Sequence, residues 1–174
     1  MTKRLRPDQF PPWYDGKSIN EAAFCRKFLA SHKLLYTENS FFTPEGRMTD
    51  EAPLKTEIYQ IIEPYASTSV PKKISNIIEL LKITAHIDDF PPQTDRIHVA
   101  NGTLFLDGSF FASKDEIVRS RFPVVYNPSA PSPETWLGFL HGLLYEDDIP
   151  TLQEYIGYCL IPSNKGQRMM VIKG

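Results

Sequence analysis

Apolar residues recur at helical spacing in three stretches of the first half of the chain. The first predicted helix begins with Ser18-Ile19-Asn20-Glu21, whose serine and glutamate fit a capping box, and it runs to about Ser31. A second helix is predicted after Thr49-Asp50 and a third after Pro71. Because a short loop joins these two, we expect them to pack as an antiparallel hairpin. The apolar positions are Ile19, Ala22, Ala23, Phe28 and Leu29, helped by Phe24 and Cys25, then Leu54, Ile58, Ile61, Ile62 and Tyr65, and then Ile74, Ile77, Ile78 and Leu81.

Shorter elements flank the first of these helices. Residues 34–37 and 40–43 are predicted strands around a Glu38-Asn39 turn, and Glu45-Gly46 forms the next turn. Residues 1–17 have no periodicity and contain three prolines, which predicts an extended arm. We expect that arm to dock through its aromatic side chains, which are Phe10, Trp13 and Tyr14.

From residue 95 the period changes from about 3.6 to 2, which is typical of strands. Ile97 and Val99 alternate with their neighbours, and Asn101-Gly102 supplies the two positive-φ residues of a tight hairpin turn. A second turn at Asp107-Gly108 completes a three-stranded meander, which ends at Phe110-Phe111.

The last third of the chain carries a further extended segment and two more predicted helices. Residues 118–126 are extended, and Pro123 favours a sheet edge for them. One helix begins at Ser132-Pro133 and the other is capped by Asp148. After a polar turn, we expect a short buried strand that ends at Gly174. The apolar faces of the two helices are Trp136, Phe139, Leu140, Leu143 and Leu144, and Leu152, Tyr155, Ile156, Cys159 and Leu160.

These patterns together predict an α+β fold. Its N-terminal half is helical, and its C-terminal half is a small antiparallel sheet, a β-meander, followed by two helices. The expected organisation is an extended arm over residues 1–17, a mainly helical subdomain over residues 18–94, and the β-meander with two helices over residues 95–174.

Composition narrows the class of protein. Of 174 residues 41% are hydrophobic and 23% are charged, and no run of about 18 apolar residues is present to cross a membrane. A formal charge of −2 argues against a general nucleic-acid coat or a membrane-surface protein. No apolar stretch follows the basic first residues, so we expect no secretion signal. Cys25 and Cys159 are predicted to be buried and reduced, which fits a soluble, cytoplasmic protein.

Residue types that carry catalysis are present without the spacing that catalysis requires. The four histidines are isolated, so we expect no metal site, and no GxSxG motif presents a serine nucleophile. His86-Ile87-Asp88-Asp89 is the densest candidate, and a solvated loop explains it better than a hydrolase using His86 or Asp89. Glu146-Asp147-Asp148 could hold a cation, although stabilising the start of a helix is the simpler explanation.

Basic residues offer another chemistry, which is contact with nucleic-acid phosphates. Arg119 and Arg121 lie two apart, so on one strand both would point the same way, toward a phosphate backbone. A solvated sheet face is the alternative explanation, and no aromatic and glycine signature for sequence readout is present. The other candidate DNA-binding residues are Lys165, Arg168, Lys3 and Arg4.

Four segments of the second half of the chain carry a resemblance to a known family. They are residues 99–106, residues 121–128, Pro133 with Trp136, Phe139 and Leu140, and residues 152–160. In order and spacing they resemble the domain that precedes the motor in phage and plasmid primase-helicases, which is shared with poxvirus-type helicase-primases. In that family a polar turn, a strand like residues 169–174 and a Walker A loop follow. The resemblance therefore implies that Gly174 is the first phosphate-binding glycine.

The resemblance implies that the chain is the N-terminal accessory domain of a superfamily-three, ring-forming helicase, truncated just before the Walker A loop. The full-length parent would bind ATP and magnesium and form a hexamer, while these 174 residues would not be an enzyme. The expected partners are single-stranded or forked DNA, the protein's own ATPase domain and further copies, with no membrane. The alternative is a stand-alone protein-interaction domain of a mobile element that does not bind DNA.

Overall fold

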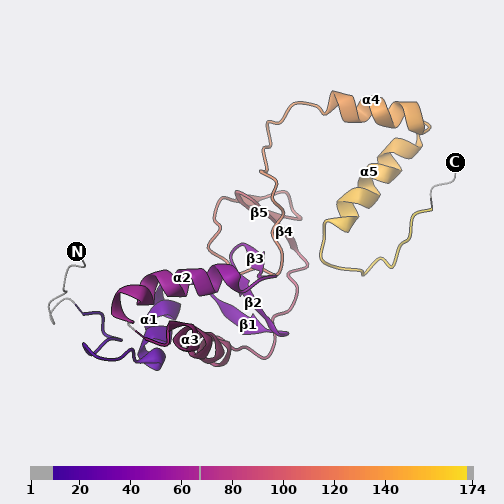
Figure 1. Ribbon diagram of the computed structural model, residues 1–174. Coiled ribbons are helices and arrows are strands. Elements are labelled where there is room, and N and C mark those ends of the chain that lie inside the picture. The colour runs from indigo at the N-terminus through magenta and orange to yellow at the C-terminus, as the bar shows by residue number, and fades with distance from the viewer. Residues whose placement is uncertain (1–9, 67, 172–174) are drawn as a thin grey trace. The chain divides into compact units, whose positions relative to one another are not determined.

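The structure, a computed structural model, describes residues 10–66 and 68–171 and divides the chain into two compact units (Figure 1). The first unit is Met1–Phe90 with Asp115–Ser120, and the second is Pro91–Lys114 with Arg121–Gly174. Each unit combines helices with a small three-stranded antiparallel sheet. The predicted α+β fold is therefore confirmed.

Three helices of the first unit bury the apolar faces that the sequence predicts. They are α1 (Glu21–Ser31), α2 (Ala52–Ile62), which continues into a 3₁₀ turn (Glu63–Tyr65), and α3 (Val70–Thr84). α3 contacts both α1 and α2. Fully burying an Ile, Leu or Phe side chain contributes about 1.5–3 kcal/mol, so this core stabilises the unit. Its helical residues that are at most 2% exposed are Phe24, Cys25, Ile58, Ile62, Ile77, Ile78 and Leu81.

The start of α1 differs from the predicted capping box. Asn20 is the N-cap, and its side-chain oxygen accepts a hydrogen bond from the Ala23 amide at 2.9 Å. Ser18 instead donates its hydroxyl and its amide hydrogen to the Asp15 carboxylate, at 3.0 and 2.6 Å. The capping box is therefore wrong because Ser18 belongs to a turn that precedes the helix. Ala22, predicted to face the core, is exposed.

The first sheet consists of β1 (Leu35–Thr37), β2 (Ser40–Thr43) and β3 (Gly46–Arg47), paired in that order. Glu38 and Asn39 both have positive φ values, 51° and 55°, which is the backbone of the tight turns that join such hairpins. The predicted hairpin is confirmed, and β3 is an addition to it. Thr43 pairs with Gly46, so Pro44-Glu45 forms the next turn and the predicted Glu45-Gly46 turn is wrong.

Residues 10–14 dock on this core as predicted. Trp13 is 5% exposed, and its ring meets those of Phe24 and Tyr65 edge-on, with centroids 5.2 and 4.9 Å apart. Phe10 and Tyr14 pack edge-on against each other at 5.0 Å. An edge-on arrangement is the favoured geometry of aromatic pairs.

The sheet of the second unit is the predicted meander with a shifted turn. It comprises β4 (Arg96–Val99), β5 (Gly102–Phe105) and β6 (Phe110–Phe111). Val99 pairs with Gly102, so Ala100-Asn101 forms the turn and the predicted Asn101-Gly102 turn is wrong. Gly102 is required for a different reason, because a Cβ atom there would lie 2.3 Å from the Phe111 carbonyl oxygen.

His98 on β4 is buried. The alternation of apolar Ile97 and Val99 with their neighbours had predicted the opposite face of the strand for it. Its Nδ1 lies 3.0 Å from the hydroxyl of Thr103, its neighbour across the hairpin. Its Nε2 lies 2.5 Å from the side-chain oxygen of Gln93. A buried polar ring is tolerated when both nitrogens have partners, as they do here.

Residues 118–126 contact sheet edges, as predicted, but they form no regular strand, and their backbone bends at Arg119 and Pro123. Within the first unit Ser120 bridges to Gly46 of β3, and within the second Phe122 bridges to Val99 of β4. Pro123 cannot donate to a ladder, which is consistent with isolated bridges here.

The last two helices are α4 (Glu134–Leu143) and α5 (Asp148–Cys159). Neither predicted cap is correct, since the N-cap positions are Pro133 and Asp147 and neither side chain bonds a free backbone amide. Their predicted apolar faces are largely exposed: Leu140 is the buried residue of α4 and Ile149 that of α5. Cys159 is also exposed, so its predicted burial is wrong.

Candidate functional site

Arg119, the first of the predicted DNA-binding residues, is held by side chains and backbone of its own unit. Its Nη1 and Nη2 donate to the two carboxylate oxygens of Glu38 at 3.0 and 2.6 Å, and its Nε donates to the carbonyl oxygen of Phe90. The guanidinium carbon also lies 5.4 Å from the centre of the Phe90 ring and 5.8 Å from that of Phe42. Because two hydrogen bonds join Arg119 to Glu38, this ion pair fixes the orientation of the guanidinium group as well as neutralising its charge. Arg119 therefore anchors residues 115–120 to the β1–β2 turn.

The Arg119–Glu38 pair shifts the titration of both groups in the direction that favours the charged pair. The hydrogen bond from Arg119 is the main cause that lowers the pKa of Glu38, and the Arg47 charge adds to it. The hydrogen bond to Glu38 raises the pKa of Arg119. The side chains are 31% and 53% exposed, so water screens part of their attraction.

Arg121 belongs to the second unit and fastens its hairpin turn. Its Nη1 donates to the carbonyl oxygens of Val99 and Gly102, at 2.8 and 3.0 Å, and these two residues flank the β4–β5 turn. Arg119 and Arg121 lie in different units and neither is in a strand, so the predicted placement of both on one strand is wrong. Contact of either residue with DNA stays a prediction.

The other predicted site residues lie toward the two ends of the chain. Lys165 and Arg168 are exposed in the loop after α5, which folds back so that the Gly166 amide donates to the Tyr158 hydroxyl at 3.0 Å. Residues 169–171 form no strand, and the rest of the predicted final strand lies outside the described residues. Lys3, Arg4 and Gly174 lie outside them as well.

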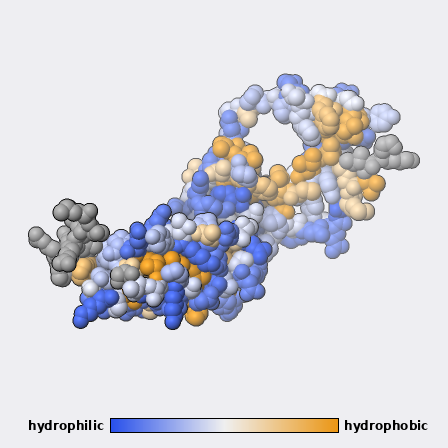
Figure 2. Space-filling view, viewed as in Figure 1, coloured by the Kyte–Doolittle hydropathy of each residue, from blue (hydrophilic) through white to orange (hydrophobic). Residues whose placement is uncertain are grey.

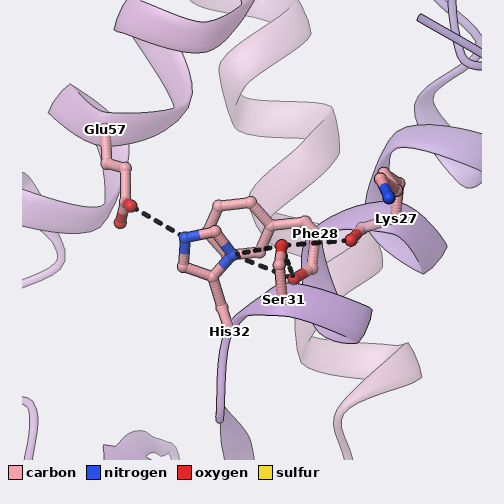
Figure 3. Close-up of polar contacts among 5 residues, drawn as sticks. All are labelled: Lys27, Phe28, Ser31, His32 and Glu57. Atoms are coloured by element: carbon pink, nitrogen blue, oxygen red, sulfur yellow. Dashed lines mark hydrogen bonds and ion pairs between the residues drawn. The ribbon is translucent and has the colours of Figure 1, made fainter.

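A cleft of about 430 Å³ in the first unit is lined by residues that are distant in sequence, including His32 and Glu57. Figure 3 shows the polar contacts of these two side chains. His32 Nε2 lies 2.9 Å from Glu57 Oε1 on α2, and Nδ1 lies 2.9 Å from the Phe28 carbonyl oxygen on α1. The His32 ring stacks on the Phe28 ring at 3.9 Å.

These His32 contacts suit a structural role at the end of α1. The His32 ring adds a contact to the Phe28 carbonyl, which also accepts the His32 amide hydrogen at 2.9 Å, and it links α1 to α2. Ser31 reinforces the same end, since its hydroxyl donates to the carbonyl oxygens of Lys27 and Phe28 at 3.3 and 3.1 Å. The sequence signal was the spacing of Phe28 and His32, four apart, which places both rings on one helix face.

The remaining catalytic candidates are dispersed. His86 Nε2 lies 3.4 Å from the Asp88 carboxylate, and both side chains are largely exposed. Within residues 10–66 and 68–171 no three His, Cys, Asp or Glu side chains gather closely enough to share a metal ion. In the same residues no helix has the length and apolar character that crossing a membrane requires.

The second unit carries an apolar and acidic surface on and around its last two helices. Trp136, Phe139 and Leu143, here named the α4 face, are 44%, 56% and 62% exposed, and the Trp136 and Phe139 rings stack at 5.6 Å. Figure 2 shows hydrophobic residues gathered on the surface over α4 and α5. Residues 122–164 contain no Lys or Arg and five exposed carboxylates, here named the acidic rim: Glu134, Glu146, Asp147, Asp148 and Glu154.

Comparison with known proteins gives one family. Residues 15–143, which include α1 to α4, match the sequence profile of the family described as "D5 N terminal like". No curated protein shows a significant match to the chain.

Proposed function

Because the chain belongs to the D5 N-terminal-like family, the N-terminal domain of D5-like primase-helicase proteins, we propose that it serves a phage or plasmid replicative DNA helicase as a non-catalytic accessory domain. In this proposal it organises a hexameric, superfamily-three ring through protein contacts ahead of the ATPase motor.

The observation that carries the assembly role is the exposed α4 face. Soluble chains rarely leave a group of large apolar side chains in water unless another protein surface covers it. By contrast, the guanidinium groups of Arg119 and Arg121 already bond acceptors within the chain. Contact with phosphates would have to compete with those bonds.

ATP and magnesium belong to the parent protein in this proposal. Gly174 would open the phosphate-binding loop, and the reading frame beyond it is expected to encode Gly-Lys-Ser or Gly-Lys-Thr within about eight residues. Sequencing past Gly174 tests this directly. A continuation without such a loop would contradict the helicase assignment.

Sedimentation velocity over a range of concentrations tests the assembly role. The chain is expected to self-associate, and Phe139→Ser with Leu143→Ser is expected to weaken that association because it removes apolar contact area. Ile83→Ser is the matched control, since Ile83 is 71% exposed on α3 and lies in the other unit. A chain that stays monomeric, or associates equally well with the α4 face changed, would contradict the proposal.

DNA engagement is the second candidate function, supported by the exposed Lys165 and Arg168, with Lys3 and Arg4 from the arm. Fluorescence anisotropy with forked and single-stranded DNA at several salt concentrations tests it. If phosphate contacts are real, binding falls steeply with salt, and Lys165→Ala with Arg168→Ala makes that dependence shallower. A chain that neither associates nor binds DNA would favour the stand-alone interaction domain.

A further inference from the structure

Charge is distributed unevenly along this chain. The 122–164 segment holds the five carboxylates of the acidic rim and no cation. Residues 3–6, Lys3-Arg4-Leu5-Arg6, hold three cations, and no other four consecutive residues of the chain carry three. The most basic and the most acidic stretches are thus separate and opposite in sign.

The chemistry of the α4 face suits a segment rich in arginine. A guanidinium group stacks on the face of an aromatic ring and pairs with carboxylates, and Trp136 and Phe139 offer exposed rings close in sequence to the acidic rim. Leucine in the same segment would cover apolar surface such as Leu143. Nucleic acid suits this surface less well, because bases could stack on the rings while phosphates would meet carboxylates.

Self-pairing of two identical α4 faces is disfavoured by the same charges. It would bring the acidic rims of two copies together without cations between them. A contact between two different surfaces avoids this repulsion, and contacts of that type are the ones that close into rings.

We propose that the α4 face and acidic rim of one copy bind residues 3–6 of a second copy. This inference rests on the proposed assembly function and names the contact that would hold neighbouring copies together. Arg4 and Arg6 would lie on the aromatic rings and pair with the rim, while Leu5 adds apolar contact.

Charge reversal in the full chain tests this contact by sedimentation velocity. Lys3→Glu, Arg4→Glu and Arg6→Glu together are expected to raise the dissociation constant of self-association about tenfold or more. Glu146→Lys, Asp147→Lys and Asp148→Lys together are expected to do the same. The chain with all six changes is expected to recover most of the association, because each cation again faces a carboxylate.

The matched control is Lys72→Glu with Lys73→Glu, which reverses two neighbouring cations on α3 and is expected to leave association unchanged. Acrylamide quenching of Trp136, taken as the difference between the chain and its Trp136→Phe variant, is expected to fall as copies associate.

Three results would overturn the inference. In the first, the variant with all six changes associates as weakly as the variants with three. In the second, Trp136 is already shielded from acrylamide when the chain is monomeric. In the third, oligothymidylate shields Trp136 in place of a second copy. Association that ignores all charge reversals but still depends on Phe139 would refute this contact and leave the proposed function standing. Absence of any self-association would refute both.

Discussion

α3 and α4 carry apolar stripes of the same kind, and they differ in what covers them. Ile77, Ile78 and Leu81 on α3 are at most 2% exposed, whereas the α4 face is 44–62% exposed. Spacing decides which residues share a helix face, but a second element with a complementary face decides whether that face is buried. α1 and α2 supply that element for α3. The α4 stripe is therefore a candidate surface for partners.

The largest expected effect is a difference between the α3 and α4 stripes in how much each contributes to the free energy of unfolding. Ile77→Ala removes a fully buried side chain and is expected to lower the free energy of unfolding by about 2–5 kcal/mol. Leu143→Ala is expected to change it by no more than about 0.5 kcal/mol, because water already surrounds most of that side chain. Urea denaturation of both variants measures the difference. Equal losses would mean that the α4 stripe is part of a folded core.

A smaller effect is expected at Arg119, where the sequence predicted DNA contact and the structure shows an internal anchor. Arg119→Ala is expected to lower the stability of the first unit by less than Ile77→Ala does, since it removes the Glu38 pair and the bond to Phe90. Arg26→Ala, at an exposed position on α1, is the matched control and is expected to change stability little. A variant that keeps full stability but loses DNA affinity would restore the original prediction.

The Arg119 effect carries a pH dependence with a defined sign. The folded pKa of Glu38 is lowered from its usual value of 4.5, so its contribution to stability is present above that value and is lost as pH falls through the lowered pKa. The difference between the wild-type chain and Arg119→Ala should hold from pH 7 to about 5 and narrow at lower pH. The stability difference that remains at low pH measures the contacts of Arg119 with Phe90.

The sequence was sufficient where structure depends on local spacing. Period 3.6 found α1, α2 and α3 with their buried positions, and the Glu38-Asn39 pair located the first hairpin, because these preferences act within a few residues. Helix starts were less predictable. Ser18 and Asn20 are both residue types that can cap a helix. Asn20 is the cap because Ser18 donates its hydrogen bonds to the Asp15 carboxylate.

Features that depend on distant partners could not be predicted in this way. Arg119 and Glu38 are 81 residues apart, and nothing in the spacing of either residue indicates the other. His98 was expected to lie opposite the apolar positions of its strand, yet Thr103 and Gln93 satisfy its ring and allow its burial. Exposure of the α4 face could not be decided from the sequence for the same reason, since a pattern does not reveal whether a covering element exists in the same chain.

The two cysteines allow the two units to be compared by thiol reactivity, with no measurement of stability. Burial raises the pKa of the Cys25 thiol to about 11, and Cys25 lies in the core of the first unit, whereas Cys159 at the end of α5 is exposed. The thiolate is the reactive form of cysteine. Ellman's reagent at pH 8 is therefore expected to modify Cys159 rapidly and to modify Cys25 only as the first unit unfolds. Cys159→Ser should remove the rapid reaction, and Cys25→Ser should leave it intact. Rapid modification of both thiols in the native chain would mean that the α1 core opens as readily as the surface of α5, and the contrast between a covered and an uncovered helix face would then no longer hold.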